Sequence, residues 1–175
     1  MKNQADIISM NRRLEALLGR SLRSAEGYLN LGMPDEAMEE LDALPAVLQA
    51  IPDVQHYRVR SLLIKHQWSD AFKLTDSVLV DFPERADFYF MKACALDQGG
   101  YPQKAKDVLM GIPVFFHDTD IFHLNLARFE AELGNRDTAR EHITRAIEIN
   151  DQARSIVLGD PTLRACVQEC PSEEN

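Results

Sequence analysis

The sequence predicts an all-α fold made of stacked helical hairpins, because columns of residues recur along it at a step of 34 positions. A column of one small residue type comprises Ala37, Ala71, Ala105 and Ala139. Twelve residues earlier, a second column also holds small or short side chains: Ala25, Val59, Ala93 and Ala127. A fixed period of this length indicates one supersecondary unit copied along the chain. Small side chains in both helices of a pair let the helix axes approach closely.

A third column marks the expected turns between the two helices of each hairpin. Its members stand five residues before the alanine column: Gly32, His66, Gly100 and Gly134. Glycine ends helices because it adopts the left-handed conformation without a Cβ penalty. Histidine adopts that conformation less readily. We therefore expect the turn at His66 to have the most strained backbone of the four, or to be built differently.

The stretch 86–112 shows the hairpin pattern well, with apolar residues at helical spacing on both sides of Gly99 and Gly100. Pro102 suits the first turn of a second helix, where a missing N–H is tolerated. The expected organisation is an N-terminal helical extension, four repeats, and a capping helix with a tail. Their residue ranges are 1–17, then 18–51, 52–85, 86–119 and 120–151, and finally 152–175.

Both ends of the array show helix signals of their own. Leu14, Leu17 and Leu18 continue the apolar face of the first repeat, so its helix should begin well before Ser21. Near the other end, Asp160 followed by Pro161 is typical of a helix N-terminus. An atypical last helix is what a stack of repeats needs to cover its final apolar face.

Composition limits the classes of partner. The formal net charge of −9 disfavours nucleic acid and anionic membrane as partners. The first residues do not resemble a secretory signal, no run of 18 apolar residues occurs, and three cysteines do not form a disulfide framework. We expect a cytoplasmic protein with no cofactor.

The 34-residue step and its columns resemble the tetratricopeptide repeat family. The clearest matches in the first and third units are Ala25, Tyr28, Gly32, Ala37, Leu41, Tyr89, Ala93, Leu96, Ala105 and Leu109. In the second and fourth units they are Leu62, Ala71, Pro83, Leu126, Ala127, Ala139, Ile143 and Ala146. The resemblance implies a right-handed α-α superhelix, a solenoid, whose first helices line a concave groove. It also implies binding of a peptide or protein segment there, without catalysis.

Helical spacing predicts which residues would line that groove. The candidates are His56, Tyr57, Arg60, Phe90, Met91, Cys94, Asn125 and Arg128. Aromatic, methionine and arginine side chains favour recognition because they supply contact area and directional bonds. Alternatively, Phe90 and Met91 are ordinary core or solvated-surface residues, since a rotation of one residue changes every assignment. The groove positions lack the lysine and asparagine cluster with which one subgroup of the family clamps a chaperone's C-terminal carboxylate.

Two other sets of residues suggest chemistry, and each has a simpler interpretation. His117, Asp118, Asp120 and His123 could ligate a metal. In the simpler interpretation, Asp118, Thr119 and Asp120 form a loop and a helix N-cap. Cys166 and Cys170 lack the second ligand pair of a zinc site, so packing explains them better.

Cys94 and an acidic run also have structural interpretations. Cys94 has no recognisable base in the sequence that would make it a nucleophile. The acidic run from Asp35 to Asp42 complements the dipole of a helix start, with an acidic docking stripe as the alternative.

Three functional hypotheses follow. The first is a non-catalytic interaction module that binds a protein or peptide ligand in the groove. The second is a small acidic secretion chaperone, and the third is a metal-dependent or thiol-dependent enzyme. A monomer and a weak homodimer both remain open, because an uncovered end of the stack could pair with a second copy.

Overall fold

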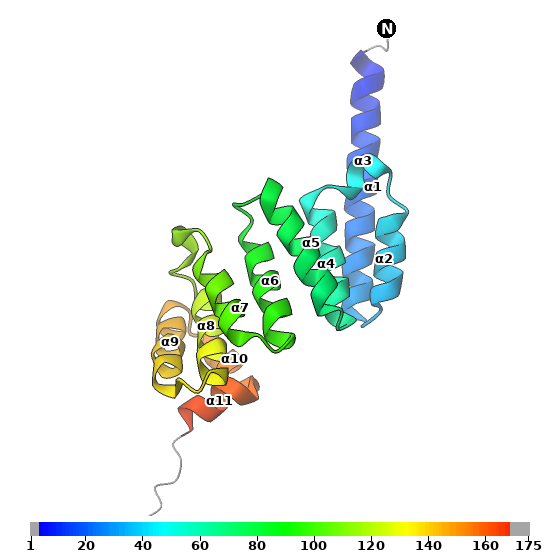
Figure 1. Ribbon diagram of the computed structural model, residues 1–175. Helices are drawn as coiled ribbons and strands as arrows, with labels where there is room; N and C mark the ends of the chain where they lie inside the picture. The colour runs from blue at the N-terminus through cyan, green and yellow to red at the C-terminus, as the bar shows by residue number, and fades with distance from the viewer. Residues whose placement is uncertain (1–3, 169–175) are drawn as a thin grey trace, which may run out of the picture. The chain divides into compact units, whose positions relative to one another are not determined.

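The computed structural model describes residues 4–168, and these contain eleven α-helices, one 3-10 helix and no strand (Figure 1). Cys170 and the rest of the expected tail lie outside the described residues. The helices are α1 (Gln4–Asn30), α2 (Pro34–Asp42), α3 (Ala46–Gln49), α4 (Pro52–Ile64), α5 (Trp68–Asp81), α6 (Ala86–Gln98), α7 (Pro102–Met110), η1 (Val114–Phe116), α8 (Asp120–Glu132), α9 (Arg136–Ile149), α10 (Ala153–Gly159) and α11 (Pro161–Val167). This architecture confirms the predicted all-α fold of successive helix pairs.

The chain divides into two compact units, residues 1–91 and 92–175, which are described separately. In unit 1, α1 packs on α2 and α4, α2 packs on α4, and α4 packs on α5. The core of α1 to α4 comprises Ala25, Leu29, Ala37, Leu41, Leu44, Leu48 and Val54. As expected, the helix of the first repeat begins long before Ser21, and Leu14, Leu17 and Leu18 pack against this core.

In unit 2, α8 packs on α9, α7 packs on α8, and α11 packs on both α8 and α9. Its core comprises Leu124, Ala127, Ala139, Ile143, Ala146, Ala153, Val157, Leu163 and Cys166. Asp160 caps α11 by accepting hydrogen bonds from the backbone N–H groups of Thr162 and Leu163, at 2.8 and 3.1 Å. Leu163 and Cys166 come from α11, so this helix extends the apolar core beyond the α8–α9 pair.

The two columns of small residues lie where the packing argument requires. All eight side chains are at most 1% exposed: Ala25, Ala37, Val59, Ala71, Ala93, Ala105, Ala127 and Ala139. A larger side chain at any of these positions would push the helix axes apart. The 34-residue period therefore reflects the spacing of the positions at which neighbouring helices pack closely.

The four turns inside the hairpins share one hydrogen-bonding pattern, and this corrects one alternative drawn from the sequence. At Gly32, φ is 72°, and the N–H of Met33 bonds to the carbonyl of Tyr28. At His66, φ is 58°, and the N–H of Gln67 bonds to the carbonyl of Leu62 in the same way. The second turn is thus not built differently. It is a Schellman-type turn with a histidine in the left-handed position.

The structure also shows a longer period that was not deduced from the sequence. Shifting α2, α4 and α5 by 68 residues reproduces the bounds of α7, α8 and α9. The short helices α3 and η1 interrupt the chain at equivalent places, each after a proline in extended conformation, Pro45 and Pro113. Two hairpins with a short helical insertion thus form a block that occurs twice.

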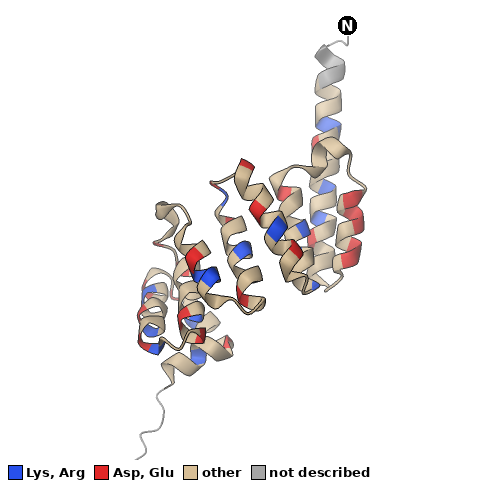
Figure 2. Ribbon diagram, in the orientation of Figure 1, with Lys and Arg blue, Asp and Glu red and all other residues tan. Residues whose placement is uncertain are grey.

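Figure 2 shows acidic residues along α2, and several of them have structural partners within unit 1. Asp35 pairs with Lys65, Asp42 pairs with Arg58 at 2.6 Å, and Glu40 accepts a hydrogen bond from Ser21 at 2.7 Å. Asp35 also lies in the first turn of α2, where a negative charge complements the helix dipole. Part of the acidic run therefore attaches α2 to its neighbours. None of the described helices has the length and apolar character needed to cross a membrane.

Candidate functional site

The predicted groove residues lie on the first helices of the hairpins. His56, Tyr57 and Arg60 are on α4, and α6 and α8 carry the other five: Phe90, Met91, Cys94, Asn125 and Arg128. Seven of the eight side chains are partly exposed, whereas Met91 is only 9% exposed. Met91 therefore matches the alternative interpretation as a core residue. Residues up to Met91 belong to unit 1 and the others to unit 2, so each unit has its own candidate surface.

In unit 1, side chains from three successive first-helix segments enclose a pocket of about 290 Å³. Its lining residues are Leu22, Asp53, His56, Tyr57, Arg85 and Asp87. Arg85 donates two hydrogen bonds to Asp87, at 2.9 and 2.8 Å, and a third to Asp53 at 3.0 Å. The Nδ1 of His56 bonds to Asp87 Oδ2 at 2.9 Å. We call this group of six residues the Asp87 pocket.

The charges of the Asp87 pocket are fixed by these hydrogen bonds. Burial alone would raise the pKa of Asp87, but the bonds from Arg85 and His56 hold it well below its usual range. The bond to Asp87 likewise raises the pKa of Arg85. Asp87 is thus a permanent anion and Arg85 a permanent cation, and both side chains are held in place before any ligand arrives.

Tyr57 and Arg60, both on α4, contact each other beside the Asp87 pocket. The guanidinium carbon of Arg60 lies 5.5 Å from the centre of the Tyr57 ring, within the range of a cation–π contact. Tyr57 also meets the His56 ring edge-on, with ring centres 5.4 Å apart. Burial, followed by the charge of Glu26, raises the pKa of Tyr57, so its hydroxyl stays protonated and can donate a hydrogen bond.

In unit 2, Arg128 is already engaged with the C-terminal part of the chain. Its Nε and Nη2 atoms donate to Asp160 Oδ2 at 3.0 and 2.9 Å. The same Asp160 carboxylate caps α11 through its other oxygen. Although Arg128 lies on the predicted surface, it holds the start of α11 in place. Removing it would test stability as well as binding.

Beside Arg128 lie two carboxyl groups, Asp97 on α6 and Glu132 on α8. Asp97 is only 6% exposed, and no donor among the described residues reaches its Oδ1 atom. Partial burial, followed by a hydrogen bond with Asp97, raises the pKa of Glu132 to about 7. Glu132 therefore takes up a proton at a higher pH than an ordinary glutamate does.

Cys94 lies near this pair and is partly exposed. Burial, followed by the charge of Asp97, raises the pKa of the Cys94 thiol, and the opposing effect of Arg128 is smaller. A reactive cysteine needs a lowered pKa, because the thiolate is the nucleophile. The surroundings of Cys94 therefore act against thiol chemistry.

The four residues of the suggested metal cluster point to different partners. Asp118 pairs with Arg145 at 2.6 Å, Asp120 accepts from Asn150 at 2.6 Å, and Nδ1 of His123 lies 3.0 Å from Nδ1 of His142. Nε2 of His117 donates to the carbonyl of Ile112 at 3.0 Å. Among the described side chains, those of residues 8–168, no three His, Cys, Asp or Glu residues are grouped to hold a metal ion.

The structure confirms that this loop leads into a helix N-cap. Thr119 is the N-cap residue of α8, and its hydroxyl accepts from the N–H of Phe122 at 3.3 Å. Asp120 follows it in the first turn.

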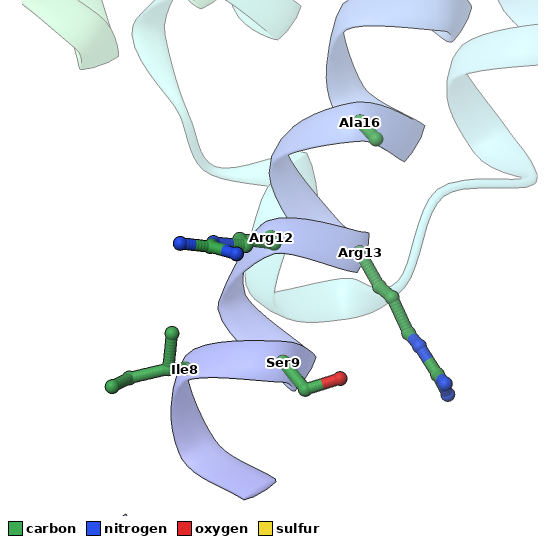
Figure 3. Close-up of a pocket in the computed structure, with 5 residues that line it drawn as sticks. All are labelled: Ile8, Ser9, Arg12, Arg13 and Ala16. Atoms are coloured by element: carbon green, nitrogen blue, oxygen red, sulfur yellow. The ribbon is translucent and has the colours of Figure 1, made fainter. Parts of the chain in front are cut away.

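A further hollow of about 450 Å³ lies on the N-terminal half of α1 (Figure 3). It is lined by Ile8, Ser9, Arg12, Arg13 and Ala16, all from this one helix. Arg12 and Arg13 point to opposite sides in Figure 3. Because no second element contributes a side chain, this surface is less defined than the Asp87 pocket.

Sequence reasoning missed the central role of Arg85. It lies just outside α6, before a helix start and after Pro83, so helical spacing does not assign it to a face. Its partners Asp53 and Asp87 stand 34 residues apart, at equivalent positions of neighbouring repeats. A cation next to such an acidic column was the available signal.

Comparison with known proteins agrees with this fold. The family model for the tetratricopeptide repeat matches residues 122–152, which include most of α8 and all of α9. The chain is also similar to the solved structure described as "MamA RS-1 ArsTM double mutant", with a TM-score of 0.63 and 18% sequence identity. The similarity covers 79% of this chain and 78% of that chain. A search of curated proteins gave no match.

Residues 122–152 thus contain a tetratricopeptide repeat, and the described helix pairs share the fold of the similar structure. Tetratricopeptide repeats generally serve as interaction modules that bind other proteins.

Proposed function

We propose that the protein is a non-catalytic interaction module that binds a segment of another protein on the faces of its first helices. The observation that supports this most directly is the Asp87 pocket. Its ionic side chains come from α4 and the start of α6 and are fixed by mutual hydrogen bonds. A surface held rigid before binding loses little side-chain entropy when a partner docks.

Tyr57 and Arg60, which lie beside each other on α4, supply contact area for such a partner. Tyr57 presents an aromatic ring with a protonated hydroxyl, and Arg60 presents a guanidinium above it. Tyrosine and arginine are enriched among the residues that dominate binding energy in protein interfaces. The raised pKa of Cys94 and the dispersed His117–His123 residues give the enzyme hypothesis no support of their own.

Reversing the charge of Arg60 tests this proposal. We expect Arg60→Glu to weaken capture of the partner from native lysate by about tenfold or more, because a like-charge contact replaces a favourable one. The melting temperature should change by less than about 4 °C, since Arg60 is a partly exposed side chain. Quantitative mass spectrometry of the captured proteins and thermal unfolding of both variants supply the two measurements.

Lys73→Glu is the matched control. Lys73 is an exposed residue of α5, the second helix of the same hairpin, and its charge changes by the same amount. Its capture profile should equal that of the wild type. If Arg60→Glu and Lys73→Glu have equal effects, the first-helix face is not the binding surface.

A further inference from the structure

The Asp87 pocket keeps one negative charge that its own side chains do not neutralise. Its lining contains two aspartates, Asp53 and Asp87, one arginine, Arg85, and a histidine that is counted as neutral. The charges of Glu26 and Arg60, which both act on the tyrosine of the pocket, have opposite signs and leave this balance unchanged. The pocket therefore favours a cation over an anion.

The hydrogen bonds inside the pocket occupy some acceptors and leave others open. Both oxygens of Asp87 accept bonds from Arg85, and Oδ2 also accepts the bond from His56 Nδ1. Asp53 accepts from Arg85 through its Oδ1 atom. Among the described residues, no donor reaches the Oδ2 atom of Asp53. Asp53 is thus the carboxylate of the lining that can still receive a donor.

The bond to Asp87 also determines which nitrogen of His56 is an acceptor. An ionised carboxylate only accepts, so His56 Nδ1 carries the proton of this bond. In the neutral ring, Nε2 then has a lone pair, and the hydroxyl of Tyr57 can accept as well as donate. Neither atom has a hydrogen-bond partner among the described residues. The pocket thus offers three acceptors: Asp53 Oδ2, His56 Nε2 and Tyr57 Oη.

The cavity that carries these acceptors is open to solvent and has an apolar side. Its volume is about 290 Å³. Asp53 is exposed and the other lining residues are partly exposed, so a ligand can enter without displacing the core. Leu22 and the ring of Tyr57 supply apolar surface against which an alkyl chain can pack. The cavity therefore suits a chain of methylene groups that ends in a cation.

We propose that the Asp87 pocket receives a lysine side chain of the bound segment. The proposal rests on the proposed function and adds to it the chemistry of one partner residue. A lysine ammonium has three donors, and the pocket has three acceptors without a donor of their own. An arginine fits less well, because its planar fork bonds best to both oxygens of one carboxylate. Arg85 already occupies at least one oxygen of each aspartate.

The test uses the whole chain and three small probes: Nα-acetyl-lysine amide, Nα-acetyl-arginine amide and the uncharged Nα-acetyl-norleucine amide. The ring nitrogens of His56 are followed by ¹⁵N NMR at about pH 8, above the range in which histidine ordinarily takes up a proton. Lysine amide should shift the Nε2 signal, because this nitrogen then accepts a hydrogen bond. Its affinity should exceed that of arginine amide by about threefold or more, and norleucine amide should leave the signal unchanged.

Asp53→Asn removes the charged acceptor and keeps the shape of the side chain. It should weaken lysine binding by about threefold to fivefold, as expected for a charge pair that is partly exposed. Asp70→Asn is the matched control, because Asp70 is also exposed, also lies in the first turn of its helix, and also pairs with one cation, Lys73. This control should bind lysine amide as the wild type does.

Three results would overturn the inference: equal responses to lysine and norleucine amide, arginine amide binding as tightly as lysine amide, or a lysine affinity that Asp53→Asn leaves unchanged. Failure here is distinguishable from failure of the proposed function. If partner capture still depends on Arg60 while lysine amide has no effect, only the assignment of lysine to the pocket is wrong. If capture is indifferent to Arg60→Glu, the proposed function fails whatever the probes do.

Discussion

His66 holds the left-handed position of its turn with φ of 58°, where the other three turns of the set have glycine. A residue with a Cβ pays about 1–2 kcal/mol for this conformation. The His66 ring also meets the Trp68 ring edge-on, with centres 5.0 Å apart, which offsets part of the cost. The turn is thus strained in its backbone and supported by one aromatic contact.

Comparing two substitutions at His66 isolates this backbone cost. His66→Ala and His66→Gly both remove the ring contact, but only glycine removes the Cβ. We expect His66→Gly to be more stable than His66→Ala by about 1 kcal/mol, measured by urea unfolding.

The reverse order is expected at Ser77, an exposed position within α5. There the alanine variant should be more stable than the glycine variant by about 1 kcal/mol in the free energy of unfolding. The same order of glycine and alanine at both sites would contradict the left-handed assignment of His66.

The raised pKa of Glu132 leads to a second prediction, on how stability depends on pH. Its pKa is about 7 in the folded chain and 4.5 in its ordinary state, so the folded state binds the proton more tightly. Stability must then fall as pH rises from about 4.5 to about 7, and stay level above that. Glu132→Gln removes this pH dependence. The stability of the variant should therefore rise relative to that of the wild type as the pH increases from about 4.5 to about 7.

Because Glu132 is exposed, we expect a gain of no more than about 1 kcal/mol at pH 8. Urea unfolding of both proteins at about pH 5 and about pH 8 measures it. A difference that is the same at the two pH values would mean that Glu132 does not titrate with a raised pKa.

At the scale of the element, Asp160 joins two roles in one side chain. One carboxylate oxygen caps α11, and the other pairs with Arg128 of α8. Burial alone would raise the pKa of Asp160, but its hydrogen bonds to Leu163 and Arg128 hold it below the ordinary value. The attachment of α11 therefore depends on a group that is ionised at neutral pH.

Two substitutions separate these roles. Asp160→Asn keeps a good cap residue and loses the charge, whereas Asp160→Ala loses both. We expect Asp160→Ala to cost about 1 kcal/mol more than Asp160→Asn in the free energy of unfolding, with faster amide hydrogen exchange in α11. Equal losses in the two variants would show that capping contributes little here.

The sequence predicted the helices and turns well for a physical reason that is visible in single residues. Ala71 and Ala105 are small because two helices cross there, so their spacing directly reports the packing. The short helices α3 and η1 were missed, since segments of four and three residues are too short to show a period. Pro45 and Pro113, which precede them at equivalent places, were the available signal.

The candidate surface was less accessible to such reasoning. Helical spacing placed Tyr57 and Arg60 on one face, but it could not separate buried Met91 from partly exposed Phe90, its immediate neighbour. Arg128 is predicted as a groove residue, and its bond to Asp160 depends on where α11 packs. Pairings between residues more than thirty positions apart require the tertiary arrangement.

At the scale of the whole molecule, the net charge of −9 is distributed over both units and is partly neutralised by internal pairs. The candidate surface of each unit combines aspartate with an arginine that is already bound. In unit 1 the carboxylates of the Asp87 pocket have fixed partners, whereas in unit 2 the Oδ1 atom of Asp97 has no donor among the described residues.

The block of 68 residues has a consequence for lengthening the protein. The short insertions before α4 and α8 occur in every second connection between hairpins. Copying a lone hairpin would bring two connections of one kind next to each other. Growth of this array in whole blocks keeps the alternation intact, so the natural increment of the architecture is a pair of hairpins.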